Sequence, residues 1–349
     1  MIRISGVTRM AALALAAGLV AAPAQAQSLT GAGATFPYPV YSKWFDAYAK
    51  ATGVKVNYQS IGSGGGIRQF TQGTVDFGAT DSPMTTEQMA AVKGNVVHLP
   101  TVLGAVVLTY NLPALGATRL KLDAATIADI FLGKITTWND ARIAALNPGV
   151  RLPKMDLIVV HRSDGSGTTF VFVDYLSKVS AEWKTKVGAA ASVSWPVGLG
   201  GKGNEGVTQQ VKQLEGTIGY VELVYAASNK LPVAMVKNSA GQFVEPTLQA
   251  VTAAAAGTRL DKTTDFRVSI TNAAGAASYP IASYTWLLLK TDNPDAAKGK
   301  AIRDFVSWMA GPEAQKMADA LGYAPLPAEV AGLVRERLKT LRAAGRPIA

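Results

Sequence analysis

Strand-like and helix-like segments alternate along most of the sequence, and this alternation constrains the fold more than any other feature. Apolar side chains recur at helical spacing in residues 40–51, whereas residues 54–58 alternate as a strand does. Short buried strands are expected at residues 75–80 and 152–160. Helices that alternate with strands in this way predict an α/β fold.

Two longer apolar segments of β type, residues 100–110 and 283–290, could pass between two lobes. The length of 349 residues favours about two domains, at roughly 150 residues each. With 48% apolar and 17% charged residues the composition is that of a globular protein rather than a disordered chain. The sequence has no cysteine, which excludes disulfides, zinc ribbons, iron–sulfur clusters, thiol nucleophiles and lipid anchors on cysteine.

The first 26 residues have the pattern of a secretory signal peptide. Arg3 and Arg9 precede an apolar run at residues 10–22, and residues 23–26 (PAQA) supply small residues for cleavage after Ala26. The alternative is a membrane anchor, but the run is shorter than the ~20 residues that a span requires. We therefore expect residues 1–26 to be removed and the mature protein to be soluble in the bacterial periplasm, without a lipid anchor.

The charge balance is basic, with 34 Lys and Arg against 24 Asp and Glu. Export and the scattered distribution of these charges argue against a nucleic-acid partner, so none is expected. The densest basic segment, residues 335–346, is expected to form the solvated face of a helix. A positive field would favour encounters with small anions.

Three segments share one pattern: a strand-like run leads through small residues and a hydroxyl into an expected helix start. They are residues 30–37, 62–66 and 164–169. Each one alone is typical of an ordinary helix cap. Together they favour anion binding, because helix N-termini offer unpaired N–H groups and a partial positive charge.

Two carboxylates narrow the choice of anion. Asp81 follows the expected strand at residues 75–80, at the end where α/β sheets bind ligands; alternatively it caps a helix before Pro83. Arg162 and Asp164 are two residues apart and could form a pair. A carboxylate that faces an anion is costly unless the anion carries a proton for it to accept. Phosphate near neutral pH meets this condition, and sulfate does not.

The ordered motifs of this chain resemble those of the periplasmic phosphate-binding proteins of phosphate-specific ABC transporters. The matching motifs are residues 31–37 (GAGATFP), 62–66 (GSGGG), 76–81 (DFGATD), 161–168 (HRSDGSGT) and 195–203 (WPVGLGGKG), and the resemblance runs from about residue 28 to 331. It implies a two-lobed periplasmic-binding-protein fold with the ligand in the cleft between lobes that two crossing segments join. We expect lobe 1 at residues 27–106 and 282–349, and lobe 2 at residues 107–281.

The resemblance also implies roles for individual residues. From one lobe, phosphate would be held by the backbone of Ala34, Thr35 and Phe36, the Thr35 hydroxyl, and Ser63. Asp81 would accept the phosphate proton, and Arg162 would supply charge, oriented by Asp164. Ser166, Gly167 and Thr168 would complete the site from the other lobe. The chain departs from the commonest pattern at Gly64, where a second serine is usual, and at His161, often an arginine.

The implied partners are inorganic phosphate and the inner-membrane permease subunits of an ABC transporter, and the expected state is a monomer. No cofactor, no metal and no enzymatic activity are expected. One enzyme alternative remains: residues 201–206 (GKGNEG) match the dinucleotide-binding pattern, with Glu222 as a possible ribose ligand. A second alternative is another anion, such as sulfate, molybdate or an organic phosphate. Asp81 is the residue that discriminates among these anions.

Overall fold

The computed structural model describes residues 2, 28–261 and 265–348. The predicted signal peptide and its cleavage site after Ala26 lie outside these residues, apart from residue 2. Within the described part, no helix combines the length and the apolar composition that crossing a membrane requires.

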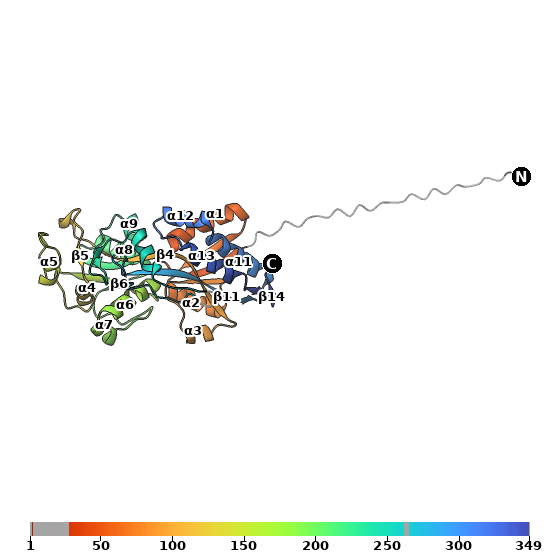
Figure 1. The fold of residues 1–349 in the computed structure, drawn as a ribbon, viewed down its shortest axis with the longest axis horizontal. Helices are drawn as coiled ribbons and strands as arrows, with labels where there is room; N and C mark the ends of the chain where they lie inside the picture. Colours follow the sequence, from red (N-terminus) through yellow and green to blue (C-terminus); the bar gives the residue numbers. More distant parts are fainter. Residues whose placement is uncertain (1, 3–27, 262–264, 349) are drawn as a thin grey trace.

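One eight-stranded sheet links the two halves of the molecule (Figure 1). Its strand order is β2-β1-β3-β11-β4-β8-β6-β7. The strands are parallel within β2-β1-β3 and within β8-β6-β7, and antiparallel where β11 and β4 join these groups. The bounds are β1 Ser28–Gly33, β2 Lys55–Ser60, β3 Phe77–Thr80, β4 Val96–Tyr110, β6 Ile158–Arg162, β7 Leu199–Gly201, β8 Thr217–Glu222 and β11 Ala282–Lys290.

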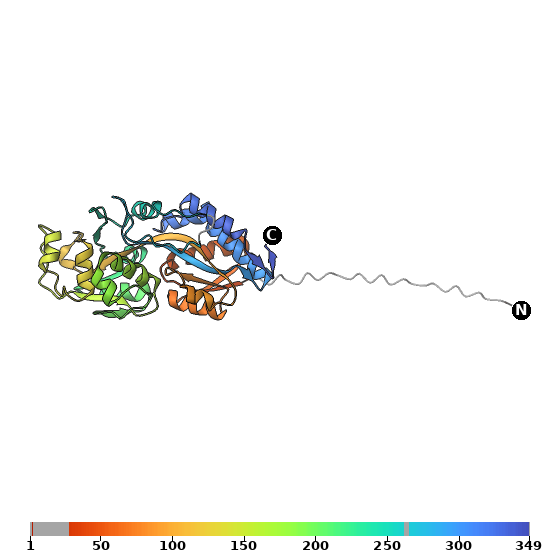
Figure 2. The ribbon, with the colours of Figure 1, turned by 60° about the horizontal axis from the view of Figure 1, so that its bottom comes forward.

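Strand β4 belongs to both halves because it changes partner along its length. Residues 96–105 pair with β11, and residues 106–110 pair with β8. The second crossing, at Ile281, is tied to the first by a hydrogen bond from the Val106 N–H to the Ile281 carbonyl (2.8 Å). Figure 2 shows β4 and β11 running from the red and blue half into the green one. The predicted crossing segments therefore correspond to β4 and β11, while the exact lobe boundaries stay a prediction.

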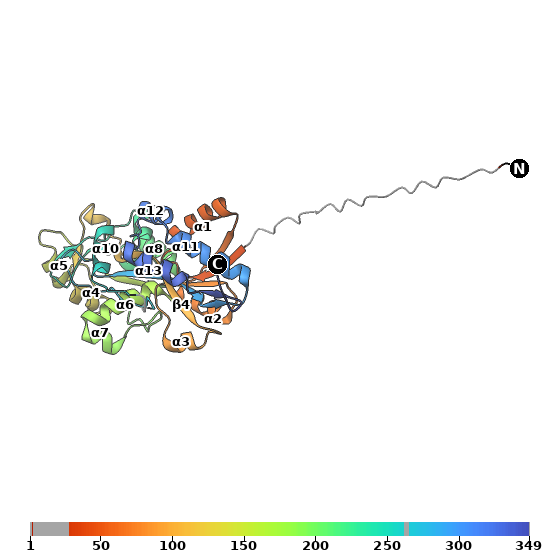
Figure 3. The same ribbon diagram turned by 45° about the vertical axis from the view of Figure 1, so that its right-hand side comes forward.

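Helices cover the sheet in both halves (Figure 3). Two small sheets, β10-β9-β5 and β12-β13-β14, complete the described structure. The helices are α1 Tyr38–Thr52, α2 Ser63–Gln72, α3 Thr86–Ala90, α4 Ala124–Phe131, α5 Ala141–Leu146, α6 Gly167–Val179, α7 Ala181–Lys186, α8 Gly203–Gln213, α9 Leu223–Ser228, α10 Leu248–Ala256, α11 Ala296–Met309, α12 Pro312–Ala320 and α13 Ala328–Leu338, with a 3-10 turn at Pro113–Leu115. The short strands are β5 Lys121–Leu122, β9 Met235–Lys237, β10 Phe243–Val244, β12 Asp292–Asn293, β13 Arg342–Ala343 and β14 Arg346–Pro347.

Helix α1 is fixed by aromatic packing against the C-terminal helices. Tyr48 and Phe45 contact Phe305 with ring centroids 5.0 and 5.8 Å apart, and Trp44 meets Trp308 edge-on. These aromatic pairs bury large apolar surfaces and prefer defined geometries. The loop that precedes α1, residues 34–37, is thereby held at one end by a rigid helix.

The alternation of helices and strands is confirmed, with three differences. Strand β3 begins at Phe77 rather than residue 75, because residues 74–76 form a bend. Strand β6 begins at Ile158 rather than residue 152, because the residues before it make only an isolated bridge, between Asp156 and Thr137. The basic segment is helical only in part. α13 ends at Leu338, and Arg342 and Arg346 lie in the strands β13 and β14, because the chain turns at Ala344 and Gly345 with positive φ angles.

Candidate functional site

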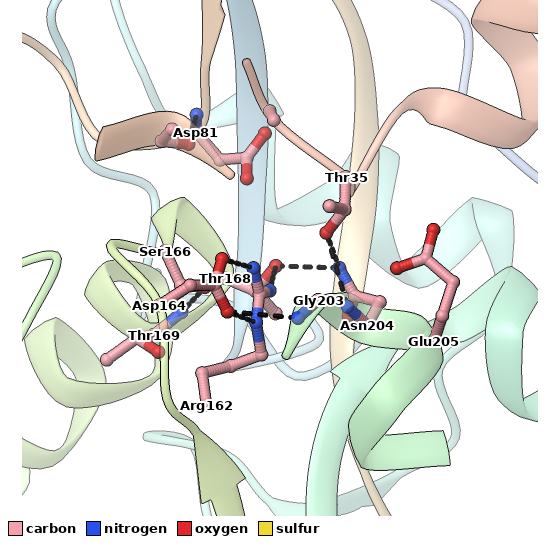
Figure 4. Close-up of polar contacts among 12 residues, drawn as sticks. Thr35, Asp81, Arg162, Asp164, Ser166, Thr168, Thr169, Gly203, Asn204 and Glu205 are labelled. Carbon is pink, nitrogen blue, oxygen red and sulfur yellow. Dashed lines mark hydrogen bonds and ion pairs between the residues drawn. The ribbon is translucent and has the colours of Figure 1, made fainter. Parts of the chain in front are cut away.

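The carboxyl ends of six strands, three from each parallel group, point to one place between the two halves. The segments that follow β1, β2 and β3 contribute Thr35, Ser63 and Asp81. The segments that follow or end β6, β7 and β8 contribute a second set, Arg162, Asp164, Ser166, Thr168, Asn204 and Glu222. Figure 4 shows Asp81 and Thr35 above Arg162, Thr168 and Asn204. Ligands of open α/β sheets bind at such carboxyl ends.

The loop after β1 offers two backbone donors rather than the three that were predicted. The Ala34 N–H donates to the Ala79 carbonyl (2.9 Å), and the Ala34 carbonyl accepts from the Tyr58 hydroxyl (2.8 Å). Ala34 is therefore committed to the sheet, since β1 and β3 continue their pairing through it, and it has no backbone donor for a ligand. Among the described residues, the N–H groups of Thr35 and Phe36 have no acceptor.

Helix α2 begins at Ser63, as predicted. Gly62 has a φ of 85°, which glycine adopts without strain. The Ser63 hydroxyl accepts a hydrogen bond from the Asp81 N–H (3.1 Å) and keeps its own proton for another acceptor. The N–H of Gly64 donates to the Gly165 carbonyl across the site (2.8 Å). Gly64 therefore connects the two halves.

Asp81 is 1% exposed, and its environment disfavours ionisation. Burial raises the pKa of its carboxyl to about 7, although a hydrogen bond from the Thr285 hydroxyl to Oδ1 (2.8 Å) and the charge of Arg162 oppose this rise. Its Oδ2 carries no hydrogen bond within the described residues. The alternative role as a helix cap is wrong, because Thr85 caps α3.

The buried Arg162 and the half-buried Asp164 form a two-point ion pair. Arg162 Nε donates to Asp164 Oδ1 (2.7 Å) and Nη2 donates to Oδ2 (2.5 Å), while Nη1 points to the Thr168 hydroxyl (3.3 Å). Burial opposes ionisation of Asp164, but the hydrogen bonds and charge of Arg162, with the Gly203 N–H, hold its pKa below the usual range. The guanidinium of Arg162 is thus held in a fixed orientation, and its edge away from Asp164 can donate hydrogen bonds to a ligand.

Helix α6 presents its N-terminus to the same place. Ser166 caps the helix by accepting from the Thr169 N–H (3.0 Å), and within the described residues the N–H groups of Gly167 and Thr168 have no acceptor. A Cβ on Gly167 would lie 2.5 Å from both Asp81 Oδ2 and Ser63 Oγ. The α6 N-terminus therefore directly faces Asp81 and Ser63.

Three residues of the site were not predicted from the sequence. Asn204 is completely buried and contacts Thr35 and Thr168. The Tyr225 hydroxyl donates to the Thr35 carbonyl (2.6 Å), and Thr285 holds Asp81. A signal for Asn204 was present, since residues 201–206 lead from β7 into α8 through small residues, as the other three segments do.

The dinucleotide alternative finds no support at α8. The N–H of Gly203 donates to Asp164 Oδ1 (3.0 Å), and that of Asn204 points to the Thr35 hydroxyl (3.3 Å), so both are occupied. Glu222 is completely buried and interacts with the Val224 N–H and the Tyr323 hydroxyl. A nucleotide pyrophosphate would have to displace Asp164 and Thr35 from this helix.

The two histidines lie outside the site. His161 stacks on Trp195 with ring centroids 4.8 Å apart, on the opposite face of β6 from Arg162. His98 is buried and accepts from the Met84 N–H (3.0 Å), and burial lowers its pKa to about 4. Among the described residues, no group of three or more His, Cys, Asp or Glu side chains is placed to hold a metal ion.

Comparisons with known proteins identify the family and the fold. The model of the PBP superfamily domain matches residues 20–313. A phosphate-binding protein PstS from Pasteurella multocida is 48% identical over 94% of each chain. Two solved structures share the fold. A high-affinity periplasmic phosphate-binding protein with bound phosphate is 22% identical, with a TM-score of 0.72 over 89% of this chain and 93% of that one. A phosphate ABC transporter substrate-binding protein from Clostridium perfringens is 18% identical, with a TM-score of 0.64 over 86% of this chain and all of that one.

Proposed function

The chain belongs to the PBP superfamily and, within it, to the PstS family of phosphate-binding proteins, and on this premise we propose that it binds inorganic phosphate outside the cytoplasm for import by an ABC transporter. The proposed ligands are those predicted from the sequence, with Ala34 removed: Thr35, Phe36, Ser63, Asp81, Arg162, Ser166, Gly167 and Thr168. Asp164 acts by orienting Arg162.

The buried carboxylate of Asp81 is the observation that carries this proposal. It faces a set of hydrogen-bond donors, namely the N-terminus of α6, the Arg162 guanidinium and the Ser63 hydroxyl. An anion bound by these donors would meet Asp81 as well. A fully ionised anion such as sulfate would leave two negative groups in contact without a proton between them. Phosphate carries that proton near neutral pH, so the same carboxylate accepts a hydrogen bond from it.

The burial of the site favours the free anion over an ester. Thr35 and Arg162 are 3% exposed, Asp81 1%, and Ser63 and Thr168 are completely buried. An organic substituent on phosphate would have to replace some of these side chains. The site thus suits a small anion whose four oxygens are all bound by protein groups.

The proposed transport step is closure of the two lobes around phosphate. Contacts that join the halves include the Gly64 N–H with the Gly165 carbonyl (2.8 Å) and the Tyr225 hydroxyl with the Thr35 carbonyl (2.6 Å). A ligand that touches both halves favours the closed form through its higher affinity for that form. The closed monomer would dock on a permease in the inner membrane, from the periplasmic side. The lobe limits proposed for this movement are residues 27–106 with 282–349, and residues 107–281.

We also propose that the protein has no catalytic role. Neither His98 nor His161 faces the site, so neither histidine can act as a general base on Ser63 or Ser166. Incubation with a chromogenic phosphate ester checks this point. Release of the chromophore by the purified protein, but not by an Arg162→Ala variant, would contradict it.

The central experiment is a calorimetric titration of the mature protein after bound anions have been removed by unfolding and refolding. We expect one-to-one binding of phosphate and no heat from sulfate at the same pH. Binding of sulfate as tight as that of phosphate would refute the role of Asp81. No binding of either anion would refute the proposed function.

A further inference from the structure

Asn204 lies at the centre of the site but is absent from the proposed ligands. It is the second residue of α8 and is completely buried. Its side-chain amide lies between Thr35, which comes from the loop after β1, and Thr168, which comes from the first turn of α6 (Figure 4). One amide therefore contacts a hydroxyl from each half of the molecule.

The orientation of this amide is fixed by a neighbour that can only donate. The backbone N–H of Glu222 lies 2.9 Å from Asn204 Oδ1. A backbone N–H has no lone pair, so the atom that faces it must be the amide oxygen. The NH₂ group is consequently turned toward the hydroxyls, with Nδ2 2.7 Å from Thr35 Oγ1 and 3.1 Å from Thr168 Oγ1.

Both hydroxyl oxygens then accept two hydrogen bonds each. Thr35 Oγ1 accepts from Asn204 Nδ2 and from the Asn204 N–H (3.3 Å). Thr168 Oγ1 accepts from Asn204 Nδ2 and from Nη1 of Arg162 (3.3 Å), and a guanidinium also can only donate. A hydroxyl has two lone pairs and one proton. With the lone pairs of both threonines in use, each hydroxyl has only its proton left to offer.

We propose that Asn204 is a positioning residue that makes the Thr35 and Thr168 hydroxyls proton donors toward the bound anion. This inference rests on the proposed function, because it takes phosphate as the acceptor of both protons. It divides the site by polarity: the two hydroxyls can only donate, and Asp81 accepts. An anion with many acceptor oxygens and at least one proton satisfies this division.

The variant Asn204→Asp tests the polarity directly. It is close to isosteric and keeps an acceptor for the Glu222 N–H, but it replaces the NH₂ donor by an oxygen that draws the hydroxyl protons away from the ligand. We expect phosphate affinity to fall by about 100-fold. The Thr35 and Thr168 hydroxyls would donate to the new carboxylate instead of to phosphate, and a negative charge is added in a buried site. The loss should shrink in mildly acidic buffer relative to wild-type, since protonation of the new carboxyl restores a donor.

The variant Asn204→Ala tests whether the effect passes through the hydroxyls. In the wild-type background we expect about a tenfold loss of phosphate affinity. In a Thr35→Val, Thr168→Val background the same change should cost less than about threefold, since there are no hydroxyls left to orient. Equal losses in the two backgrounds would assign Asn204 a merely structural role and overturn the proposal.

Asn147 provides a matched control. It is 4% exposed, and its amide makes three hydrogen bonds, to the N–H and carbonyl of Lys121 and to the Ile143 carbonyl. Asn147→Ala should lower the melting temperature without changing phosphate affinity. If wild-type protein binds phosphate and Asn204→Ala binds it equally well, the inference about Asn204 fails alone. If wild-type protein binds no phosphate, the proposed function fails and the inference fails with it.

Discussion

The Thr285 hydroxyl donates to Oδ1 of Asp81 at 2.8 Å, which links the crossing strand β11 to the carboxylate at the end of β3. β4 and β11 change register between Thr285 and Trp286, so an extra β4 residue, Thr101, is accommodated there. The bond uses one oxygen of Asp81 and leaves Oδ2 toward Gly167 and Ser63. The orientation of this carboxylate is therefore set by the strands that join the two halves.

Asp81→Asn should relax the rejection of sulfate. The amide is neutral and can donate, so a fully ionised anion no longer meets a like charge. We expect measurable sulfate competition in a phosphate displacement titration, where wild-type protein shows none. Asp76→Asn is the control, since this carboxylate lies before β3 and pairs with Lys298 (2.7 Å). Unchanged selectivity in Asp81→Asn would disprove the proposed role.

Arg162→Ala should weaken phosphate binding by more than about 100-fold and destabilise the protein by about 1–3 kcal/mol, because the half-buried Asp164 loses its charged partner and keeps only the Gly203 N–H. Arg162→Lys should restore only part of the affinity, since an ammonium group cannot form the two-point contact with Asp164. Arg142→Ala serves as the control, because that arginine is 42% exposed and pairs with Asp129 and Asp140. Titration calorimetry and urea unfolding provide the two measurements, and wild-type affinity in Arg162→Ala would show that the site is elsewhere.

Gly167→Ala should abolish tight binding while leaving the fold intact. The added Cβ would stand 2.5 Å from Asp81 Oδ2 and from Ser63 Oγ, which forces the α6 N-terminus away from the opposite half. Gly332→Ala is the matched change, in the interior of α13 with no atom within 4 Å of the new Cβ. It should leave affinity unchanged and stabilise the protein by about 0.5–1 kcal/mol. Equal phosphate affinity in the two variants would contradict the close approach at Gly167.

The stability of the ligand-free protein should depend on the protonation of Asp81. Its pKa is 3.8 in the unfolded chain and about 7 in the folded one, so the folded state binds the proton more tightly. The resulting stabilisation is present below the unfolded pKa and is lost as the pH rises through about 7. The free energy of unfolding of wild-type protein relative to Asp81→Asn should therefore fall by a few kcal/mol between about pH 4 and pH 8.

The wild-type protein must be compared with Asp81→Asn, because His98 changes the free energy of unfolding with pH in the opposite direction. Burial lowers the pKa of His98 from 6.5 to about 4, so its contribution to stability increases with pH in that window. Both proteins contain His98, and its effect cancels in the difference. Parallel pH profiles of unfolding free energy for wild-type and Asp81→Asn would show that Asp81 is not protonated in the folded state.

The parts of the site that follow local sequence rules were predictable. The starts of α2 at Ser63 and α6 at Gly167 follow from glycine and hydroxyl residues after a strand. The pairing of Arg162 with Asp164 was also expected from their spacing, and their hydrogen bonds bear it out. The helix starts and the ion pair are predictable because each depends only on residues that are neighbours in the sequence and on the direction of one strand.

The remaining parts depend on contacts between distant segments. The Ala34 N–H was predicted as a donor, but it continues the pairing of β1 with β3, which local sequence does not specify. Thr285 and Tyr225 reach the site from segments about 200 residues away from their partners Asp81 and Thr35. Asn204 could have been found by grouping residues 201–206 with the three similar segments.

The change of partner strand within β4 gives the molecule a joint made of hydrogen-bonded main chain rather than of a loop. Backbone hydrogen bonds on both sides of this joint fix the register of β4 with β11 in one half and with β8 in the other. Val106, the first residue beyond the change, pairs with Glu222, whose N–H holds the Asn204 amide. The change of partner strand and the anion site are thus connected through one hydrogen-bonded path, so the proposed closure, if it bends the sheet at this joint, would change the distance between Asn204 and Thr35.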